Sequence, residues 1–133
     1  MIRTALPALS QAMIFLDLET TGMAAAHERI TEIGLGEVRA GERVGNWSQL
    51  VNPERGIPPF IQSLTGISDA MVKHAPTFAE LAPGLFERLK GKVLIAHNAR
   101  FDYGFLRYEF ERVGLSYVPR LLCTVKLSRK LFP

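Results

Sequence analysis

The stretch FLDLETTG, residues 15–22, decides how the rest of the chain is interpreted. It carries an apolar run into a Thr-Thr-Gly turn signal, which predicts a buried strand over residues 12–18. Successive side chains of a strand point to opposite faces, so Asp17 and Glu19 share one face while the leucines beside them pack against another layer. The sequence therefore predicts two carboxylates that converge at one end of a strand.

Two like charges in a mostly apolar strand repel each other unless a cation or a shared proton offsets the repulsion. Carboxylate oxygens are hard ligands, and they suit Mg²⁺ or Mn²⁺. The pair alone leaves a second interpretation open, in which the strand ends at the surface and both acids are solvated. A further acid that meets the pair would favour the metal site.

Such an acid follows a second apolar run. Residues 93–96 predict a short buried strand, and the sequence HNARFD, residues 97–102, comes directly after it. Asn98 is a residue type that caps helix N-termini, and Asp102 then lies about one turn into the helix, where it could meet the first pair. An acid in a first helical turn also interacts favourably with the helix dipole, which is the alternative role for Asp102.

The segments between and around these motifs predict an α/β fold with a mixed sheet. Residues 30–38 and 44–51 surround a turn and would form an antiparallel three-stranded meander with the first strand. Residues 67–76 are expected to form a loop. Helices are expected over 58–64, 77–89 and 99–113, and a last strand and helix over 121–125 and 126–132.

Composition limits the class of protein. The chain of 133 residues fits one compact domain, and its 47% hydrophobic and 22% charged residues are typical of globular proteins. Its apolar runs are far shorter than the roughly 20 residues of a membrane helix, and the N-terminus lacks a secretory signal pattern. We therefore expect a cytoplasmic protein with no membrane partner. The single Cys123 excludes an internal disulfide.

Positive charge gathers in the C-terminal third of the chain. Residues 100–133 hold seven Lys or Arg against three acids, a net +4, whereas the whole chain carries +3. A polyanion such as a nucleic acid could be attracted to this region. Solvated helix faces would account for the same charges equally well.

Together these segments resemble the DnaQ-like (DEDD) 3′ to 5′ exonuclease family, which includes the proofreading epsilon subunit of bacterial DNA polymerase III. The sequence DLETTG, residues 17–22, is similar to the first family motif, and HNARFD with the following Phe105-Leu106 is similar to the second. The resemblance covers residues 13 to about 125. Further family signatures are matched in order by RITEIG (29–34), LTGI (64–67) and APTF (75–78).

The resemblance implies a ribonuclease-H-like fold and hydrolysis of phosphodiester bonds with two Mg²⁺ or Mn²⁺ ions, releasing nucleoside monophosphates. Asp17 would bridge the two ions, Glu19 would serve the ion that activates water, and Asp102 would serve the other. Leu64 and Ile67 would pack against the terminal bases, unless they are core residues of a short helix. The substrate-binding positions implied around the acids are Thr20, Thr21 and Gly22 for the terminal nucleotide, Asn98 for the substrate backbone, and His97 and Phe101 beside it.

The third motif of the family, a general-base His with a carboxylate five residues later, is not found in these 133 residues. His97 and Asp102 have this spacing, but they already belong to the second motif. We therefore expect an N-terminal extension over 1–11 and an exonuclease domain over 12–133 that is incomplete at its C-terminus. Such a chain would bind one divalent ion well and degrade DNA slowly.

The leading hypothesis is a metal-dependent exonuclease that acts on single-stranded or frayed DNA 3′ ends. As a proofreading subunit, it would have a DNA polymerase catalytic subunit as its partner. One alternative is a non-catalytic module that binds nucleic acid or a polymerase on the same fold. Another is an RNA exonuclease similar to oligoribonuclease.

We predict that extending the chain at its C-terminus with a His-x-x-x-x-Asp helix speeds Mn²⁺-dependent release of 3′ nucleotides by about 10²- to 10⁴-fold, the usual contribution of a general base. Release of labelled nucleotide from the extended and 133-residue chains measures this, with Asp17→Ala as the control that abolishes release. Equal rates in all three proteins would contradict the metal mechanism.

Overall fold

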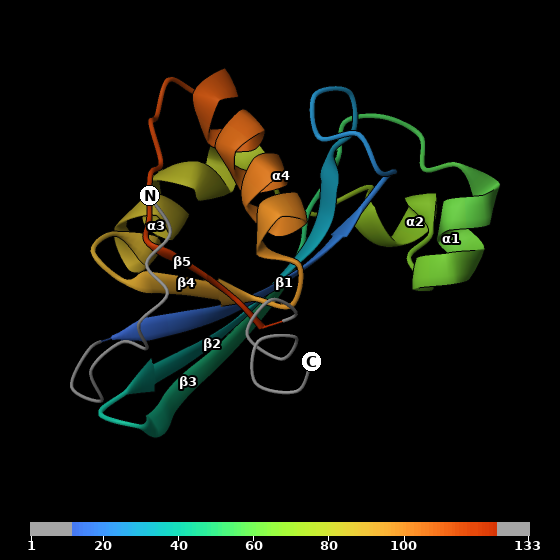
Figure 1. The fold of residues 1–133 in the computed structure, drawn as a ribbon. Coiled ribbons are helices and arrows are strands. Elements are labelled where there is room, and N and C mark those ends of the chain that lie inside the picture. The colour runs from blue at the N-terminus through green and yellow to red at the C-terminus, as the bar shows by residue number, and fades with distance from the viewer. Residues whose placement is uncertain (1–11, 125–133) are drawn as a thin grey trace.

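A five-stranded mixed sheet in the order β3-β2-β1-β4-β5 forms the centre of the molecule (Figure 1). The computed structural model describes residues 12–124. β1, β2 and β3 are antiparallel neighbours, whereas β4 and β5 join β1 in parallel, so the predicted meander and mixed sheet are confirmed. The strands are β1 (Met13–Thr20), β2 (Ile30–Arg39), β3 (Glu42–Leu50), β4 (Val93–Ala96) and β5 (Leu121–Cys123).

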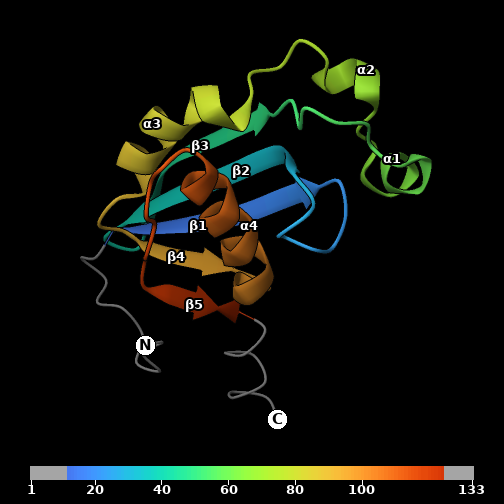
Figure 2. The same ribbon diagram turned by 90° about the horizontal axis from the view of Figure 1, so that it is seen from above.

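Helices cover one face of this sheet. α4 contacts β1, β4 and β5 and packs against α3 (Figure 2). α1 and α2 lie apart from that pair and form a small lobe beyond the strand ends, as both Figure 1 and Figure 2 show. The helices are α1 (Pro59–Thr65), α2 (Asp69–Val72), α3 (Phe78–Leu89) and α4 (Ala99–Arg112).

The core lies between the sheet and these two long helices. Ile14, Leu16 and Leu18 of β1 are buried in it, in the same cluster as Phe78 and Phe110, whose ring centroids are 5.1 Å apart. Each fully buried side chain of this size contributes roughly 1.5 to 3 kcal/mol. The alternate residues of β1 face the opposite, open side of the sheet. This burial on a single face holds both acids of β1 on the open side.

The helix boundaries follow local signals. Proline begins α1, and Gly66 ends it with a left-handed φ of 76° that glycine adopts without strain. Thr77 caps the start of α3, since its hydroxyl accepts a hydrogen bond of 3.2 Å from the Glu80 amide. Asn98 does precede α4, but its side chain makes no capping hydrogen bond, so that part of the expectation is wrong.

The loop predicted over 67–76 is also wrong in part, because it contains α2. Ser68 accepts a hydrogen bond from the Met71 amide, and Asp69 lies in the first turn, where its charge favours the helix dipole. The extension over 1–11 and the helix expected over 126–132 fall outside the described residues. Across residues 12–124, none of the helices has both the length and the apolar character needed to cross a membrane.

Candidate active site

The end of β1 extends past the end of β4, and α4 begins beside it. β4 runs along β1 only as far as the pair Phe15 and Ile95, and the chain leaves β4 after Ala96. α4 starts three residues later and contacts β1. The first turn of α4 therefore lies beside the half of β1 that carries Asp17 and Glu19.

Asp102, in that first turn, has the most perturbed carboxyl group of the site. Its residue is only 8% exposed, and no hydrogen bond or ion pair joins its carboxylate to another residue in the described part of the chain. Burial, followed by the charges of Asp17 and Glu19, raises the pKa of Asp102 to about 7. Three acids from two distant segments thus share one electrostatic environment.

Glu32 brings a fourth carboxylate that the sequence did not suggest. It lies directly opposite Glu19 across β1 and β2. Burial raises the pKa of Glu19, and the charges of Asp17 and Glu32 raise it further. Like charges in opposed positions of a sheet are destabilising, so this pair needs a compensating ligand or proton. The sequence predicts that the two strands are neighbours in the meander. It does not predict the register that places Glu32 opposite Glu19.

These acids do not form a ready-made metal cage. Within residues 12–124, no group of three or more His, Cys, Asp or Glu side chains is arranged to hold a metal ion as it stands. Asp17 is exposed and Glu19 is half-buried, so both have room to change rotamer around the fixed Asp102. The donor set consists of carboxylate oxygens under mutual repulsion. Oxygen ligands of this kind suit a hard divalent cation such as Mg²⁺ or Mn²⁺. The side chains would have to move closer together to coordinate it.

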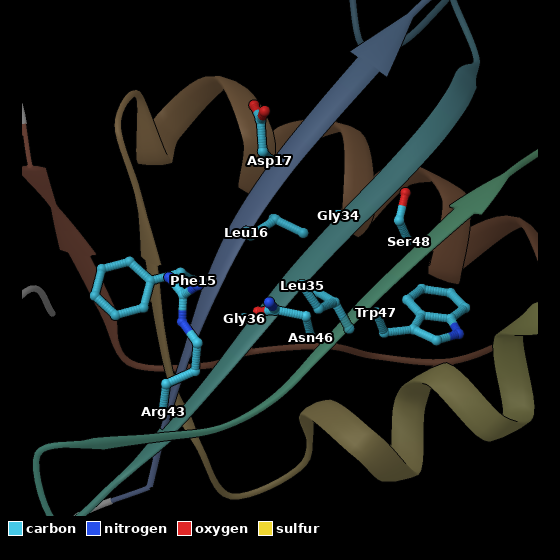
Figure 3. A pocket seen from close by; sticks show the side chains of 10 residues that line it. All are labelled: Phe15, Leu16, Asp17, Gly34, Leu35, Gly36, Arg43, Asn46, Trp47 and Ser48. Atoms are coloured by element: carbon cyan, nitrogen blue, oxygen red, sulfur yellow. The ribbon is translucent and has the colours of Figure 1, made fainter.

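A shallow pocket of about 440 Å³ on the open face of the sheet reaches Asp17 (Figure 3). Gly34 lies beside Asp17 and Gly36 lies beside Phe15, and neither glycine has a side chain to fill the space. Figure 3 shows the Asp17 carboxylate directed away from Phe15 and Arg43. Asp17 is therefore accessible to solvent from the part of the pocket lined by the two glycines.

The segment after β1 is tightly bonded within itself. The hydroxyl of Thr20 donates to the Gly22 carbonyl at 2.6 Å. The hydroxyl of Thr21 donates to Glu28 and accepts from the Arg29 amide. A Cβ on Gly22 would come within 2.8 Å of the Glu28 carboxyl carbon, so only glycine fits without a shift. Both hydroxyl protons are thus already donated, and the Thr21 amide and the Gly22 carbonyl are also bonded within this segment. A nucleotide would therefore contact the backbone groups of 20–22 that remain.

Three further predicted residues surround the start of α4. His97 and Asn98 are exposed, and His97 Nδ1 lies 3.0 Å from the Thr124 hydroxyl. Phe101 is half-buried and packs against Phe105, with ring centroids 5.0 Å apart. His97 and Asn98 are therefore accessible beside Asp102, whereas Phe101 mainly supports the helix.

The two apolar residues predicted to contact bases lie in the separate lobe. Leu64 is 71% exposed on α1, but Ile67 is only 4% exposed and belongs to a small core with Ile57 and Val72. Ile67 is therefore a core residue of this lobe, in the segment between α1 and α2. The lobe is joined to the segment after β1 through Arg55, which donates to the His27 carbonyl at 2.8 Å and pairs with Glu28.

The model of an exonuclease family, RNase T, matches residues 14–133. The chain belongs to this exonuclease family. The expected DnaQ-like relationship and ribonuclease-H-like fold are confirmed by this match, by the sheet order and by the relatives.

Two curated relatives in this family are longer proteins. A PolC-type DNA polymerase III from Caldanaerobacter subterraneus is 39% identical over 93% of this chain, and the 3′-5′ exonuclease DinG of Bacillus subtilis is 37% identical over 92%. This chain spans 9% of the first and 13% of the second. The solved structure of exonuclease X in complex with 5′ overhanging duplex DNA matches with a TM-score of 0.71 and 31% identity, covering 91% of this chain and 64% of that one.

The raised pKa of Asp102 predicts a pH-dependent stability. In the absence of metal, the folded state holds the Asp102 proton up to about pH 7, while the unfolded state loses it near 3.8, so the free energy of unfolding falls as pH rises between these values. Asp102→Asn removes this loss. It should therefore stabilise the protein more at pH 8 than at pH 5, by roughly 1 to 3 kcal/mol.

Urea unfolding in EDTA at the two pH values measures this difference. Glu111→Gln, which changes an exposed acid on the same helix, is the matched control and should show no such pH dependence. An equal effect of Asp102→Asn at both pH values would show that the carboxyl group is not perturbed.

Proposed function

We propose that this domain is a divalent-metal-dependent 3′ to 5′ exonuclease that removes nucleoside monophosphates from DNA ends. The observation that carries the proposal is the electrostatic coupling of Asp102 to Asp17 and Glu19, which come from separate segments in a chain of the exonuclease family. Repulsion of this kind is unfavourable for folding and is relieved by a cation. A purely structural role for the three acids would not favour placing them together.

Asp17, Glu19 and Asp102 are the residues that would hold the ion. When bound, the ion supplies Lewis-acid stabilisation of the charge that develops on the phosphoryl group and helps to activate water. Asp102 would have to lose its proton to solvent to serve as a ligand, because a carboxylate binds a cation only in its charged form. Asp17 and Glu19 would have to change rotamer to bind the ion, and Glu32 would add negative charge from its position opposite Glu19.

The surroundings of these acids provide room for a DNA 3′ end. The exposed His97 and Asn98 would hydrogen-bond to the phosphate backbone, and the backbone of 20–22 would line the terminal nucleotide. The glycine-floored pocket beside Asp17 leaves space for the scissile phosphate. DNA as the substrate is supported by the exonuclease X complex with DNA, and the 3′ to 5′ direction by the relative named as a 3′-5′ exonuclease.

A proofreading role beside a DNA polymerase catalytic subunit is supported by the PolC-type relative. Proofreading needs an exonuclease that acts on frayed ends without reading their sequence. Contacts from a loop backbone and from the exposed, apolar Leu64 are of this sequence-tolerant kind.

Mg²⁺ or Mn²⁺ at about 100 times its dissociation constant should stabilise the protein by about 2.7 kcal/mol at pH 8. This corresponds to a rise of several degrees in the midpoint of thermal unfolding. Asp17→Asn and Asp102→Asn should each lose most of this shift, whereas Glu111→Gln should keep it. Equal shifts in all four proteins would place the ion elsewhere.

With DNA labelled at its 3′ end, the label should appear at once as a mononucleotide, and with DNA labelled at its 5′ end, the product should shorten gradually. Asp17→Asn or Asp102→Asn should slow both signals by at least about 10²-fold, the usual effect of removing a group that stabilises the transition state. RNA of matched sequence serves as the comparison. Faster cleavage of RNA would favour the RNA exonuclease, and binding of DNA without any cleavage would favour a non-catalytic module.

A further inference from the structure

Glu109 is a fully buried acid on α4 that the proposed reaction does not use. It is 1% exposed and lies about two helical turns after Asp102, on the same face of the helix. Its carboxylate accepts from Arg29 at 2.8 and 3.0 Å, from Arg112 at 3.1 Å and from the Ile30 amide at 3.2 Å. Acids are almost never buried so completely unless they are paired, and here two arginines neutralise one acid.

This carboxylate attaches the loop between β1 and β2 to α4. The Thr21 amide donates to the Arg29 carbonyl at 2.8 Å, and the Arg29 amide donates to the Thr21 hydroxyl at 3.0 Å, so the two ends of the loop are joined. The Arg29 side chain then fixes the joined ends to Glu109. Arg112 also reaches the Ala26 carbonyl at 3.4 Å, and the loop runs alongside the helix in Figure 1.

The two parts held together here carry different components of the site. The loop begins with residues 20–22, and α4 carries Asp102. We propose that Glu109 is a positioning residue: through Arg29 it holds the backbone of 20–22 against α4, so that the terminal nucleotide is bound in register with Asp102. This inference rests on the proposed function, because it assigns the loop to nucleotide binding.

A buried ion pair is weak evidence for a stabilising role, because the loss of hydration can exceed the gain from attraction. Its forked geometry fixes orientation strongly, since the Arg29 Nε and a terminal nitrogen both bond to one carboxylate. Removing the charge should therefore affect the fit of the substrate more than the binding of the ion.

The test compares Glu109→Gln, which keeps the side-chain shape, with the milder Arg29→Lys, which loses the fork. Glu111→Gln is the matched control. Glu111 is an exposed acid on α4, and its ion pair with Arg107 is a long surface contact, with 3.6 Å between Nε and Oε1. Glu109→Gln should raise KM for DNA 3′ ends about 10-fold with a smaller fall in kcat. In Glu109→Gln, the Mn²⁺ concentration that gives half of the rise in the unfolding midpoint should stay within about twofold of the wild-type value. Arg29→Lys should change KM in the same direction, and Glu111→Gln should not change it.

Amide hydrogen exchange provides a readout that does not depend on activity. In Glu109→Gln, the amides of 21–30 should exchange at least about 10-fold faster, while those of Ile14–Leu18 keep their protection. Uniformly faster exchange, or a loosened loop with unchanged KM, would overturn the positioning role. If the loop loosens as expected but the wild-type protein releases no 3′ nucleotide, the proposed function fails while the attachment of the loop by Glu109 stands.

Discussion

Repulsion among carboxylates at the meeting of β1 and α4 is the constraint on which the rest of the structure depends. Asp102 is nearly buried beside Asp17 and Glu19, so its charged form is unfavourable near neutral pH. The fold holds it there because the helix that carries it is fixed elsewhere, by Phe105, Leu106 and Phe110 in the core. Apolar burial along one face of α4 therefore offsets an electrostatic cost at its first turn.

The parts of this arrangement that depend on local pattern could be predicted from the sequence. Alternation along β1 predicted that Asp17 and Glu19 share a face, and the apolar run of β4 followed by a polar segment predicted where α4 begins. Burial of one face of a strand fixes side-chain direction with a period of two residues, so a short stretch carries enough information. The same is true of Thr77 and Gly66, which mark helix ends through contacts only a few residues away.

Other parts depend on contacts that leave no local mark. Arg29 and Glu109 are 80 residues apart in sequence, and neither residue type indicates that the other is its partner. The opposition of Glu19 and Glu32 depends on strand register, which is shifted by an irregularity between Glu19 and Thr20. α2 was missed because four residues are too few to show helical periodicity. Tertiary packing decides all of these features after the local elements are set.

The two buried acids of α4 make the strongest argument about function when they are compared with each other. They lie on one face of one helix, yet Glu109 receives two arginines and a backbone amide, whereas Asp102 faces only like charges among the residues the structure describes. The protein could pair a buried acid at this interface, and at Glu109 it does. The carboxylate of Asp102 has no cationic or hydrogen-bonding partner among the described residues, and the neighbouring acids of β1 are accessible from the open face of the sheet. An uncompensated charge beside an accessible surface is stabilised by a ligand of opposite sign, which supports a cation site at Asp102 and a structural anchor at Glu109.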